Sequence, residues 1–315
     1  MERFDVHLAE GDFSGALAAA TTQAQRAVAL ERLGRLAECL ACCTAQGDTP
    51  AQIAMVELAH AAAHTRRQER SDAFDALTRA EEARPGWLVP AHLGRALRGY
   101  GAPAPHHAEV VALFDDYARR FDAHLLGDLG YVGHEVLAGA LHEEAPVASR
   151  GVVIDLGCGT GLCGALLRHA ARRLVGVDVS PRMLAEAAKR HLYDALAEGD
   201  LVYALATLPD ASVDALVAAD ALGYVGPLEA LFAEAARVLR PGGALAFTIE
   251  ATRTHPYELH ASRRVAFAEG YVRDLAADNG FAARRFAPTV LRHEAGDGVL
   301  SWLVVLEAGA AAAAA

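Results

Sequence analysis

The stretch VVIDLGCGTGLCGALL, residues 152–167, constrains the fold of this chain more than any other segment. It begins with consecutive branched apolar residues, which are typical of a parallel strand buried on both faces. Gly157, Gly159 and Gly161 follow at alternate positions, where glycine permits positive backbone dihedrals and lets a ligand approach the main chain. The apolar spacing after them predicts a helix that ends near residue 171. Because a strand, a glycine turn and a helix N-terminus together form a nucleotide site, we predict one here.

The size and charge of the chain narrow its class and its partners. With 315 residues and 53% hydrophobic content, it can form one large or two ordinary domains with an extensive core. Its net charge of −11 argues against nucleic acid or an anionic membrane as a partner, since both require clustered Lys and Arg. We find no basic-flanked apolar leader and no uncharged apolar run of the roughly 20 residues that a membrane span needs. We therefore expect a cytoplasmic protein.

Residues 1–100 have a helical pattern throughout, with Ala, Leu, Arg and Glu at periods of three and four. The segments GDFSGALAAA, GRLAECLACC and SDAFDALTRA each place a turn residue before an apolar helix opening, and they resemble degenerate tetratricopeptide units. The alternative is a plain helical cap with no peptide groove. We expect an all-α helical-hairpin domain over residues 1–100, joined by a Gly-, Pro- and His-rich linker at residues 101–109.

The pattern changes in residues 110–308. Two helices are predicted near residues 108–121 and 133–141, and strands then alternate with helices. We expect strands at 152–156, 174–177, within 193–198, 213–218, 244–249, 289–293 and 300–306, and helices at 181–192, 228–239 and 263–279. Such alternation predicts an α/β domain with a doubly wound, mostly parallel, Rossmann-like sheet. The Ala-rich residues 309–315 have nothing to pack against, and we expect a disordered tail there.

The details of the glycine turn favour one kind of nucleotide over another. Leu162 stands where the dinucleotide fingerprint has its third glycine, so an NAD-dependent oxidoreductase is disfavoured but remains an alternative. Asp155, just before the turn, would repel a pyrophosphate and attract a cationic amino group. Asp178 ends the next predicted strand, 21 residues after Gly157, and suits a ribose diol because one carboxylate accepts from both hydroxyls.

Four segments in order, VIDLGCGTG, LVGVDVSPRML, VDALVAADALGYVG and ARVLRPGG, resemble the class I S-adenosylmethionine-dependent methyltransferases over residues 152–249. The resemblance implies this fold, methyl transfer, and S-adenosyl-L-methionine as the cofactor. It also implies a cofactor-binding set: Asp155, Gly157, Gly159 and Gly161 around the methionine part, Asp178 at the ribose, Val179 and Met183 with residues 180–183 beside the adenine, Asp200 at the adenine amino group, and Asp220 in the methyl-donor pocket.

A narrower resemblance extends from residue 113 almost to the end of the chain. LFDDYARRFDAHLLGDLGYVGHEVLAGAL, YELHASRRVAFAEGYVRDLAADNGF and VLRHEAGDGVLSWLVVL resemble the predicted methyltransferases that carry N-terminal tetratricopeptide repeats. This resemblance implies that Tyr117 and Phe121, on the helix before the sheet, close over the cofactor. The chain departs from the pattern at residues 264–267, RVAF, where an Arg-Tyr-x-His type segment is expected. Any substrate contact that this segment makes elsewhere is therefore in doubt here.

Candidate catalytic groups lie beyond the carboxyl ends of the predicted strands, where open α/β sheets bind ligands. Asp220 and Tyr224 follow one strand, and Glu250, His255, Tyr257 and His260 follow the next. The two histidines equally fit ordinary surface positions, and we expect no metal because no third ligand is evident at a recognisable spacing. Arg253, Arg263 and Arg264 lie near the expected substrate side, either as a pocket for a carboxylate or as exposed charges.

The sequence thus predicts a methyltransferase, and the missing Asn/Asp-Pro-Pro-aromatic tetrapeptide favours the small-molecule subclass. The acceptor is a small molecule, or a group borne on a peptide or carrier protein, and its atom can be O, S, N or C. We expect the helical domain to dock the substrate or a protein partner, and a homodimer is compatible with the sequence. The leading alternative is a cofactor-binding interaction or scaffold protein with little turnover.

Overall fold

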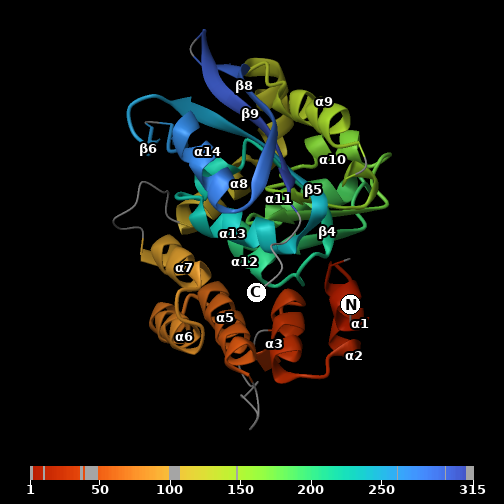
Figure 1. Ribbon diagram of the computed structural model, residues 1–315, viewed down its shortest axis with the longest axis vertical. Coiled ribbons are helices and arrows are strands. Elements are labelled where there is room, and N and C mark those ends of the chain that lie inside the picture. Colours follow the sequence, from red (N-terminus) through yellow and green to blue (C-terminus); the bar gives the residue numbers. More distant parts are fainter. Residues whose placement is uncertain are drawn as a thin grey trace. The chain divides into compact units, whose positions relative to one another are not determined.

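The computed structural model describes residues 3–9, 11–35, 38–39, 49–98, 107–146, 148–260, 262–294 and 296–309. These residues form two compact units (Figure 1): Met1–Gly101 with Ala206–Pro209, and Ala102–Leu205 with Asp210–Ala315. Most of the predicted linker at 101–109 and of the predicted tail at 309–315 lies outside the described residues. No helix in the described part of the chain is long and apolar enough to cross a membrane.

The first unit is built from helices in its described residues, as predicted. The helices are α1 (Arg3–Ala9), α2 (Phe13–Ala19), α3 (Gln23–Arg32), α5 (Pro50–Arg66), α6 (Arg70–Ala83) and α7 (Leu88–Arg98). Thr22 and Thr49 begin α3 and α5 with capping boxes, in which the Thr hydroxyl and a Gln side chain satisfy free backbone N–H groups. Val28, Leu30 and Val56 pack with small alanines in the core, so the helices approach closely. Whether these helices are tetratricopeptide repeats stays a prediction.

The second unit is organised around a mixed sheet. Its parallel part has the order β3-β2-β1-β4-β5, built from β1 (Val152–Leu156), β2 (Arg173–Asp178), β3 (Ala195–Glu198), β4 (Val213–Ala219) and β5 (Leu239–Thr252). β9 (Asp297–Ala308) pairs antiparallel with β5, and β8 (Phe281–Glu294) pairs with β9. The predicted Rossmann-like sheet is confirmed. The strand order reverses between β1 and β4, which makes that edge the expected ligand-binding crevice.

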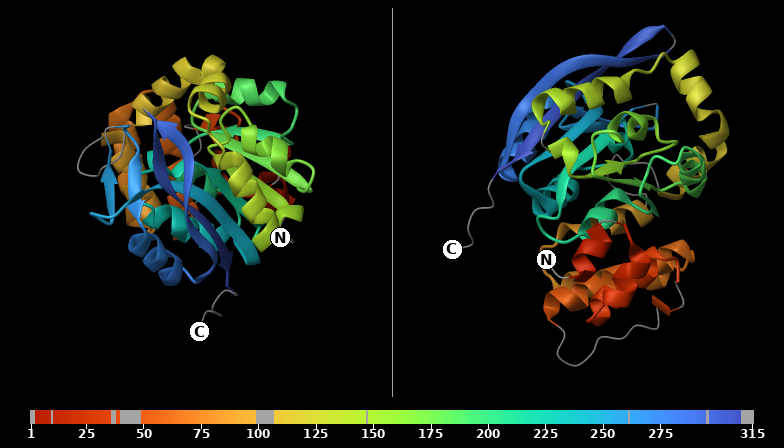
Figure 2. Two further views of the ribbon diagram at one scale, coloured as in Figure 1. Left: turned by 90° about the horizontal axis from the view of Figure 1, so that it is seen from above. Right: turned by 90° about the vertical axis from the view of Figure 1, so that its right-hand side faces the viewer.

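Helices flank this sheet in Figures 1 and 2. They are α8 (His107–Tyr117), α9 (Gly133–Glu144), α10 (Leu162–Leu167), α11 (Pro181–Lys189), α12 (Leu201–Ala206), α13 (Glu229–Val238) and α14 (Glu269–Asp278). A short 3-10 turn (Ala118–Arg120) and a π-helix (Ala123–Asp128) continue the chain after α8. Leu137 and Leu141 of α9 pack with Leu167 of α10 against Val153 and Val217, so the core fixes the glycine turn from one face of the sheet.

The prediction of one helix over residues 263–279 was wrong. The chain instead forms β6 (Tyr257–Leu259) and β7 (Val265–Ala268), and α14 starts only at Glu269. Residues 265–268, VAFA, pair with the end of β5, and this burial outweighs the helical spacing. The helix after the glycine turn also ends early, at Leu167 rather than near residue 171.

Candidate cofactor and acceptor site

The glycine turn between β1 and α10 lies against the ends of the neighbouring strands. Gly157, Gly159 and Gly161 have φ values of 72°, 53° and 92°, which glycine alone adopts readily. The N–H of Gly157 donates to the Val177 carbonyl of β2 at 2.8 Å. A Cβ added at Gly157 would collide with the methyl group of Ala221, which follows β4. The turn therefore presents bare backbone at the crevice.

Gly157→Ala is expected to destabilise the protein more than Gly280→Ala does. Both positions have positive φ, 72° and 74°, so both variants lose about 1 kcal/mol to backbone strain. A Cβ at Gly280 meets no atom within 4 Å, whereas one at Gly157 overpacks Ala221 and adds about 1–3 kcal/mol. Urea unfolding of both variants measures the difference. Equal losses would contradict the close approach of Ala221.

Asp178, at the end of β2, joins the glycine turn to α11. Its carboxylate accepts from the N–H of Gly159 and from the N–H of Ser180, each at 2.9 Å. Burial raises the pKa of Asp178, and these backbone donors oppose the rise. Ser180 caps α11 by accepting from the Met183 N–H at 3.1 Å. Met183, a candidate cofactor-binding residue, is buried at this position. Val179, another candidate, is half-buried between Asp178 and Ser180.

Asp155 is a buried acid with an unsatisfied oxygen. Its Oδ2 accepts from the Tyr193 hydroxyl at 2.7 Å, but its Oδ1 has no hydrogen-bond partner among the described residues. Burial raises the pKa of Asp155 to about 7, despite the hydrogen bond from Tyr193. An unpaired carboxylate oxygen in this place attracts a cationic group.

The segment that begins with α8 is fastened over the glycine turn by two acids that the sequence reasoning missed. Asp115 accepts from the Ser180 hydroxyl at 2.6 Å, and Asp122 accepts from the Thr160 hydroxyl at 2.5 Å and from Arg190. The two acids stand seven residues apart, two helical turns, so they share one face. That spacing is the only signal that could have found them.

One aromatic ring on the same segment lies against the turn, and closure of Tyr117 and Phe121 over a cofactor stays a prediction. Phe121 approaches Gly159, where a Cβ would lie 3.9 Å from the ring. Tyr117 and Phe121 meet edge to face, with centroids 5.4 Å apart. Burial raises the pKa of Tyr117, so its hydroxyl stays neutral at physiological pH.

Asp200 has a structural role at the start of α12. Its Oδ1 accepts from the N–H groups of Val202 and Tyr203 at 2.8 and 3.0 Å, the arrangement of a helix N-cap. The contact with an adenine amino group stays a prediction.

Asp220 lies in a buried ionic cluster beyond β4. It has a φ of 57°, its N–H donates to the Thr248 hydroxyl at 3.0 Å, and its Oδ2 accepts from Arg292 Nη1 at 2.8 Å. Arg292 is fully buried and also donates to Glu250 and, at 2.8 Å, to Glu294. Burial raises the pKa of Asp220, and Arg264 and Arg292 oppose the rise. The sequence had suggested Asp220 and Glu250 but not Arg292 or Glu294.

Tyr224 and Arg264 complete this cluster. Arg264 Nε donates to the Tyr224 hydroxyl at 2.8 Å, and its Nη1 donates to Glu250 and Glu294 at 3.3 and 3.2 Å. Burial works to lower the pKa of Arg264, but Asp220 and the neighbouring acids raise it overall, so the guanidinium stays charged. Of the three arginines suggested for a carboxylate pocket, Arg264 is the one inside the cluster, whereas Arg253 and Arg263 are exposed.

The two candidate histidines have different surroundings. His260 Nδ1 lies 3.5 Å from Glu250 Oε2, and its Nε2 lies 3.4 Å from Glu258 Oε1. His255 is exposed in the turn between β5 and β6. The structure therefore brings His260, rather than His255, to the acids of the cluster, and a catalytic role for either stays a prediction.

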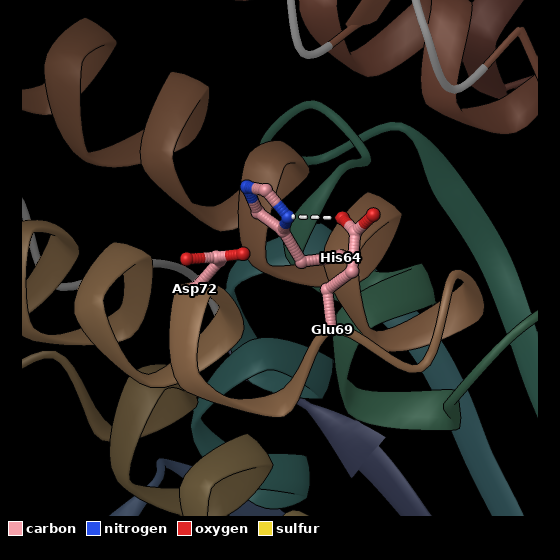
Figure 3. A group of neighbouring side chains, drawn as sticks. All are labelled: His64, Glu69 and Asp72. Carbon is pink, nitrogen blue, oxygen red and sulfur yellow. Dashed lines mark hydrogen bonds and ion pairs between the residues drawn. The ribbon is translucent and has the colours of Figure 1, made fainter.

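One group of side chains in the first unit has the composition of a metal site. His64, Glu69 and Asp72 offer ligand atoms within 4.8 Å of one another (Figure 3). Glu69, however, already bonds His64 at 2.8 Å and Arg67 at 3.0 Å. A metal ion would have to compete with the Arg67 guanidinium for this carboxylate, so we interpret the group as ion pairs that join α5 to α6.

Comparison with known proteins identifies the sheet domain. Residues 154–247 match the family model described as a methyltransferase domain. This part of the chain resembles a methyltransferase domain. The match supports the predicted methyltransferase class for residues 154–247.

Curated relatives of the methyltransferase domain cover less than half of the chain. A demethylmenaquinone methyltransferase of Tropheryma whipplei (strain Twist) is 31% identical over 145 residues, which are 44% of this chain and 58% of the relative. A trans-aconitate 2-methyltransferase of Paracidovorax citrulli is 33% identical over 147 residues, 46% of this chain and 54% of the relative. The chain spans just over half the length of these relatives.

Solved structures share the fold of the methyltransferase domain. The cyclase SpnF aligns with a TM-score of 0.54 and 19% identity, over 67% of this chain and 99% of that chain. A putative methyltransferase from Haloferax volcanii, in complex with the activator Trm112, aligns with a TM-score of 0.50 and 21% identity, over 62% of this chain and 97% of the other. At these identities the likeness shows the fold alone.

Proposed function

We propose that the protein transfers a methyl group from S-adenosylmethionine to a small-molecule or carrier-borne acceptor. The observation that carries the proposal is the arrangement of Asp155 and Asp178 on either side of the bare glycine turn, inside the matched methyltransferase domain. The names of the relatives support the acceptor class, since they include a trans-aconitate 2-methyltransferase and a malonyl-[acyl-carrier protein] O-methyltransferase.

The residues around the glycine turn fit this cofactor. Asp178 would accept from the ribose hydroxyls, and the unpartnered oxygen of Asp155 suits the cationic amino group. The aromatic rings of Tyr117 and Phe121 would exclude water from above the turn. When bound, S-adenosylmethionine supplies an activated methyl group on a positively charged sulfur. The chain therefore needs mainly to hold an acceptor in line and to exclude solvent.

The ionic cluster beyond β4 and β5 is the acceptor side of the proposed site. Asp220, Tyr224 and His260 are its candidates for moving a proton, which a hydroxyl or ammonium acceptor requires and a thiolate or carboxylate does not. Asp220 is held by Arg292 and would orient rather than freely abstract. His260 is half-buried, and its Nδ1 lies 3.5 Å from Glu250 Oε2.

We also propose that the helical unit, which we interpret as tetratricopeptide-like, docks a carrier, a peptide or a protein partner in the cytoplasm. Self-association of the chain would be one form of such docking. The alternative function is cofactor binding without useful methyl transfer. It is retained because a protein of the same fold, SpnF, is named a cyclase, so the fold alone does not imply methyl transfer.

Calorimetric titration with S-adenosylhomocysteine tests the cofactor. We expect saturable binding to the wild type, no binding of NAD, and about 10- to 100-fold weaker binding to Asp178→Ala, which lacks an ionised hydrogen-bond acceptor. Asp194→Ala is the matched control. Asp194 also accepts from a backbone N–H, that of Leu174, but at the opposite end of β2.

The outcomes of this titration separate the alternatives. A wild type that does not bind S-adenosylhomocysteine, or that binds NAD instead, would contradict the proposal. Equal weakening by Asp178→Ala and Asp194→Ala would indicate loss of structure rather than loss of a cofactor contact. If the product binds, transfer of a radiolabelled methyl group to candidate acceptors distinguishes an enzyme from a scaffold.

A further inference from the structure

Two arginines and three carboxylates make up the ionic cluster on the acceptor side. Arg264 and Arg292, here called the arginine pair, contact Glu250 and Glu294, and Arg292 also contacts Asp220. With all three carboxylates ionised, these five side chains carry one more negative than positive charge. Such an excess is costly in a buried site unless one of the carboxylates reaches solvent or leaves.

The three carboxylates differ in their exposure to solvent. The side chains of Asp220 and Glu250 are 11% and 5% exposed, whereas that of Glu294 is 41% exposed. Asp220 directly follows β4, whereas Glu250 lies near the end of β5, and together they balance the arginine pair. Glu294 is the additional acid, and it is the one that can swing into water.

Glu294 comes from the outermost part of a hairpin. It ends β8 and pairs in register with Asp297, the first residue of β9. Its Oε1 nevertheless accepts from both arginines, from Arg292 Nε at 2.8 Å and from Arg264 Nη1 at 3.2 Å. Although partial burial works to raise it, the arginine pair lowers the pKa of Glu294, so this carboxylate is ionised at neutral pH.

The position of Glu294 belongs to the proposed active site. The Tyr224 ring, whose hydroxyl accepts from Arg264, meets the Phe114 ring at a centroid distance of 5.0 Å. Phe114 in turn meets Phe121 at 6.3 Å, and Phe121 covers Gly159. A continuous row of rings therefore leads from the glycine turn to the arginine pair.

We propose that the arginine pair, together with Tyr224, binds a carboxylate of the methyl acceptor, and that Glu294 occupies this position until the acceptor displaces it. The ligand's role as the acceptor rests on the proposed function, but the carboxylate site itself does not. Exchange of one carboxylate for another leaves the charge of the cluster unchanged, so no new unpaired charge is buried. Nη2 of Arg264 has no partner among the described residues and is available to a bidentate carboxylate.

Two substitutions with opposite expected effects test the proposal. Glu294→Gln removes the competing carboxylate and is expected to tighten binding of a carboxylic acid about 3- to 10-fold. Arg264→Gln removes a charged donor and is expected to weaken that binding at least about 10-fold. The probes are malonate and trans-aconitate, titrated by calorimetry into protein saturated with S-adenosylhomocysteine, and malonamide is the neutral probe. Glu269→Gln, which disrupts an exposed pair with Arg273 on α14, is the control.

The outcomes keep this inference distinct from the proposed function. The carboxylate site is supported if malonate and trans-aconitate bind more tightly to Glu294→Gln and more weakly to Arg264→Gln than to the wild type. Binding of malonamide should not change in either variant, and Glu269→Gln should bind the two acids as the wild type does. If neither acid binds the wild type, binding that appears only in Glu294→Gln also supports it. Weaker binding or unchanged binding in Glu294→Gln overturns it, even if Arg264→Gln has lost its fold. Failure of the wild type to bind S-adenosylhomocysteine would refute the proposed function instead, and the acids are then titrated into the unloaded protein with the same criteria.

Discussion

Arg292→Met is expected to lower the free energy of unfolding by about 3–5 kcal/mol at pH 8. The Arg292 side chain has no exposed surface and contacts three carboxylates, those of Asp220, Glu250 and Glu294. Methionine fills much of the same volume, so the loss comes mainly from charge rather than from a cavity. Arg264 alone then has to balance the three acids. Chemical denaturation of the two proteins measures the difference.

The loss in Arg292→Met is expected to shrink as the pH falls. Without Arg292, the pKa of Asp220, which burial already raises, rises further, and the pKa of Glu294 is lowered less. The folded variant then binds more protons than the unfolded chain, so its stability falls with rising pH through the raised pKa values. The difference from the wild type is therefore larger at pH 8 than at pH 5. A loss that does not change with pH would show that packing, not charge, is the cause.

Arg284→Met provides the matched control for this prediction. Arg284 also pairs with an acid across strands β8 and β9, because it contacts Glu307 at 2.6 Å, but its side chain is 48% exposed. Exposed pairs contribute little, so the expected loss is much smaller than that of Arg292→Met. A comparable loss in both variants would contradict the burial argument.

The sequence indicated the surroundings of the glycine turn better than the ionic cluster, because the residues around the glycine turn are close together in the sequence. The strand, the three glycines and Asp155 lie within one short segment, and Asp178 ends the next strand. Each of these features has its own pattern: a continuous apolar run, alternating glycines, and an acid at a strand end. Their proximity follows from the parallel sheet, which the alternation of elements had already indicated.

The ionic cluster is formed by residues that are distant from one another in the sequence. Arg292 reaches Asp220 across 72 positions, from a strand whose register shifts between Val290 and His293, so that Leu291 and Arg292 are both buried. Arg264 stands just before β7, within a segment that the pattern assigned to a helix. Similarly, nothing in the sequence distinguishes His260 from His255, because only the turn before β7 brings one of them to Glu250. These residues become visible only when the strand pairing is known.

Asp155→Asn is expected to stabilise the protein at pH 8 and to leave its stability nearly unchanged at pH 4. The folded pKa of Asp155 is about 7, above its ordinary value of 3.8, because the carboxyl group is buried. Between these two values the folded chain holds a proton that the unfolded chain has lost, so wild-type stability falls as the pH rises. A pKa raised from 3.8 to about 7 lowers the folding stability at pH 8 by about 4 kcal/mol. The neutral amide of Asp155→Asn avoids this loss.

Urea denaturation at pH 4 and pH 8 measures this difference. Asp194→Asn is the control, and we expect it to lower stability at pH 8 rather than raise it. Although burial works to raise the pKa of Asp194, its hydrogen bond with Arg168 lowers it overall, so its contribution to stability is present at neutral pH and is lost on acidification. If Asp155→Asn retained the wild-type slope, the buried carboxyl group would not be the cause of that slope.

Asp155→Asn is also expected to weaken binding of S-adenosylhomocysteine, because the substitution removes the negative charge that Asp155 offers to the amino group of this ligand. Asp155 Oδ1 has no partner among the described residues, whereas Tyr193 still has an acceptor in the asparagine amide oxygen. A variant that is more stable at pH 8 yet binds less tightly would show that this unsatisfied acid costs stability for the sake of the ligand. A variant with unchanged affinity would restrict Asp155 to a structural role beneath the glycine turn.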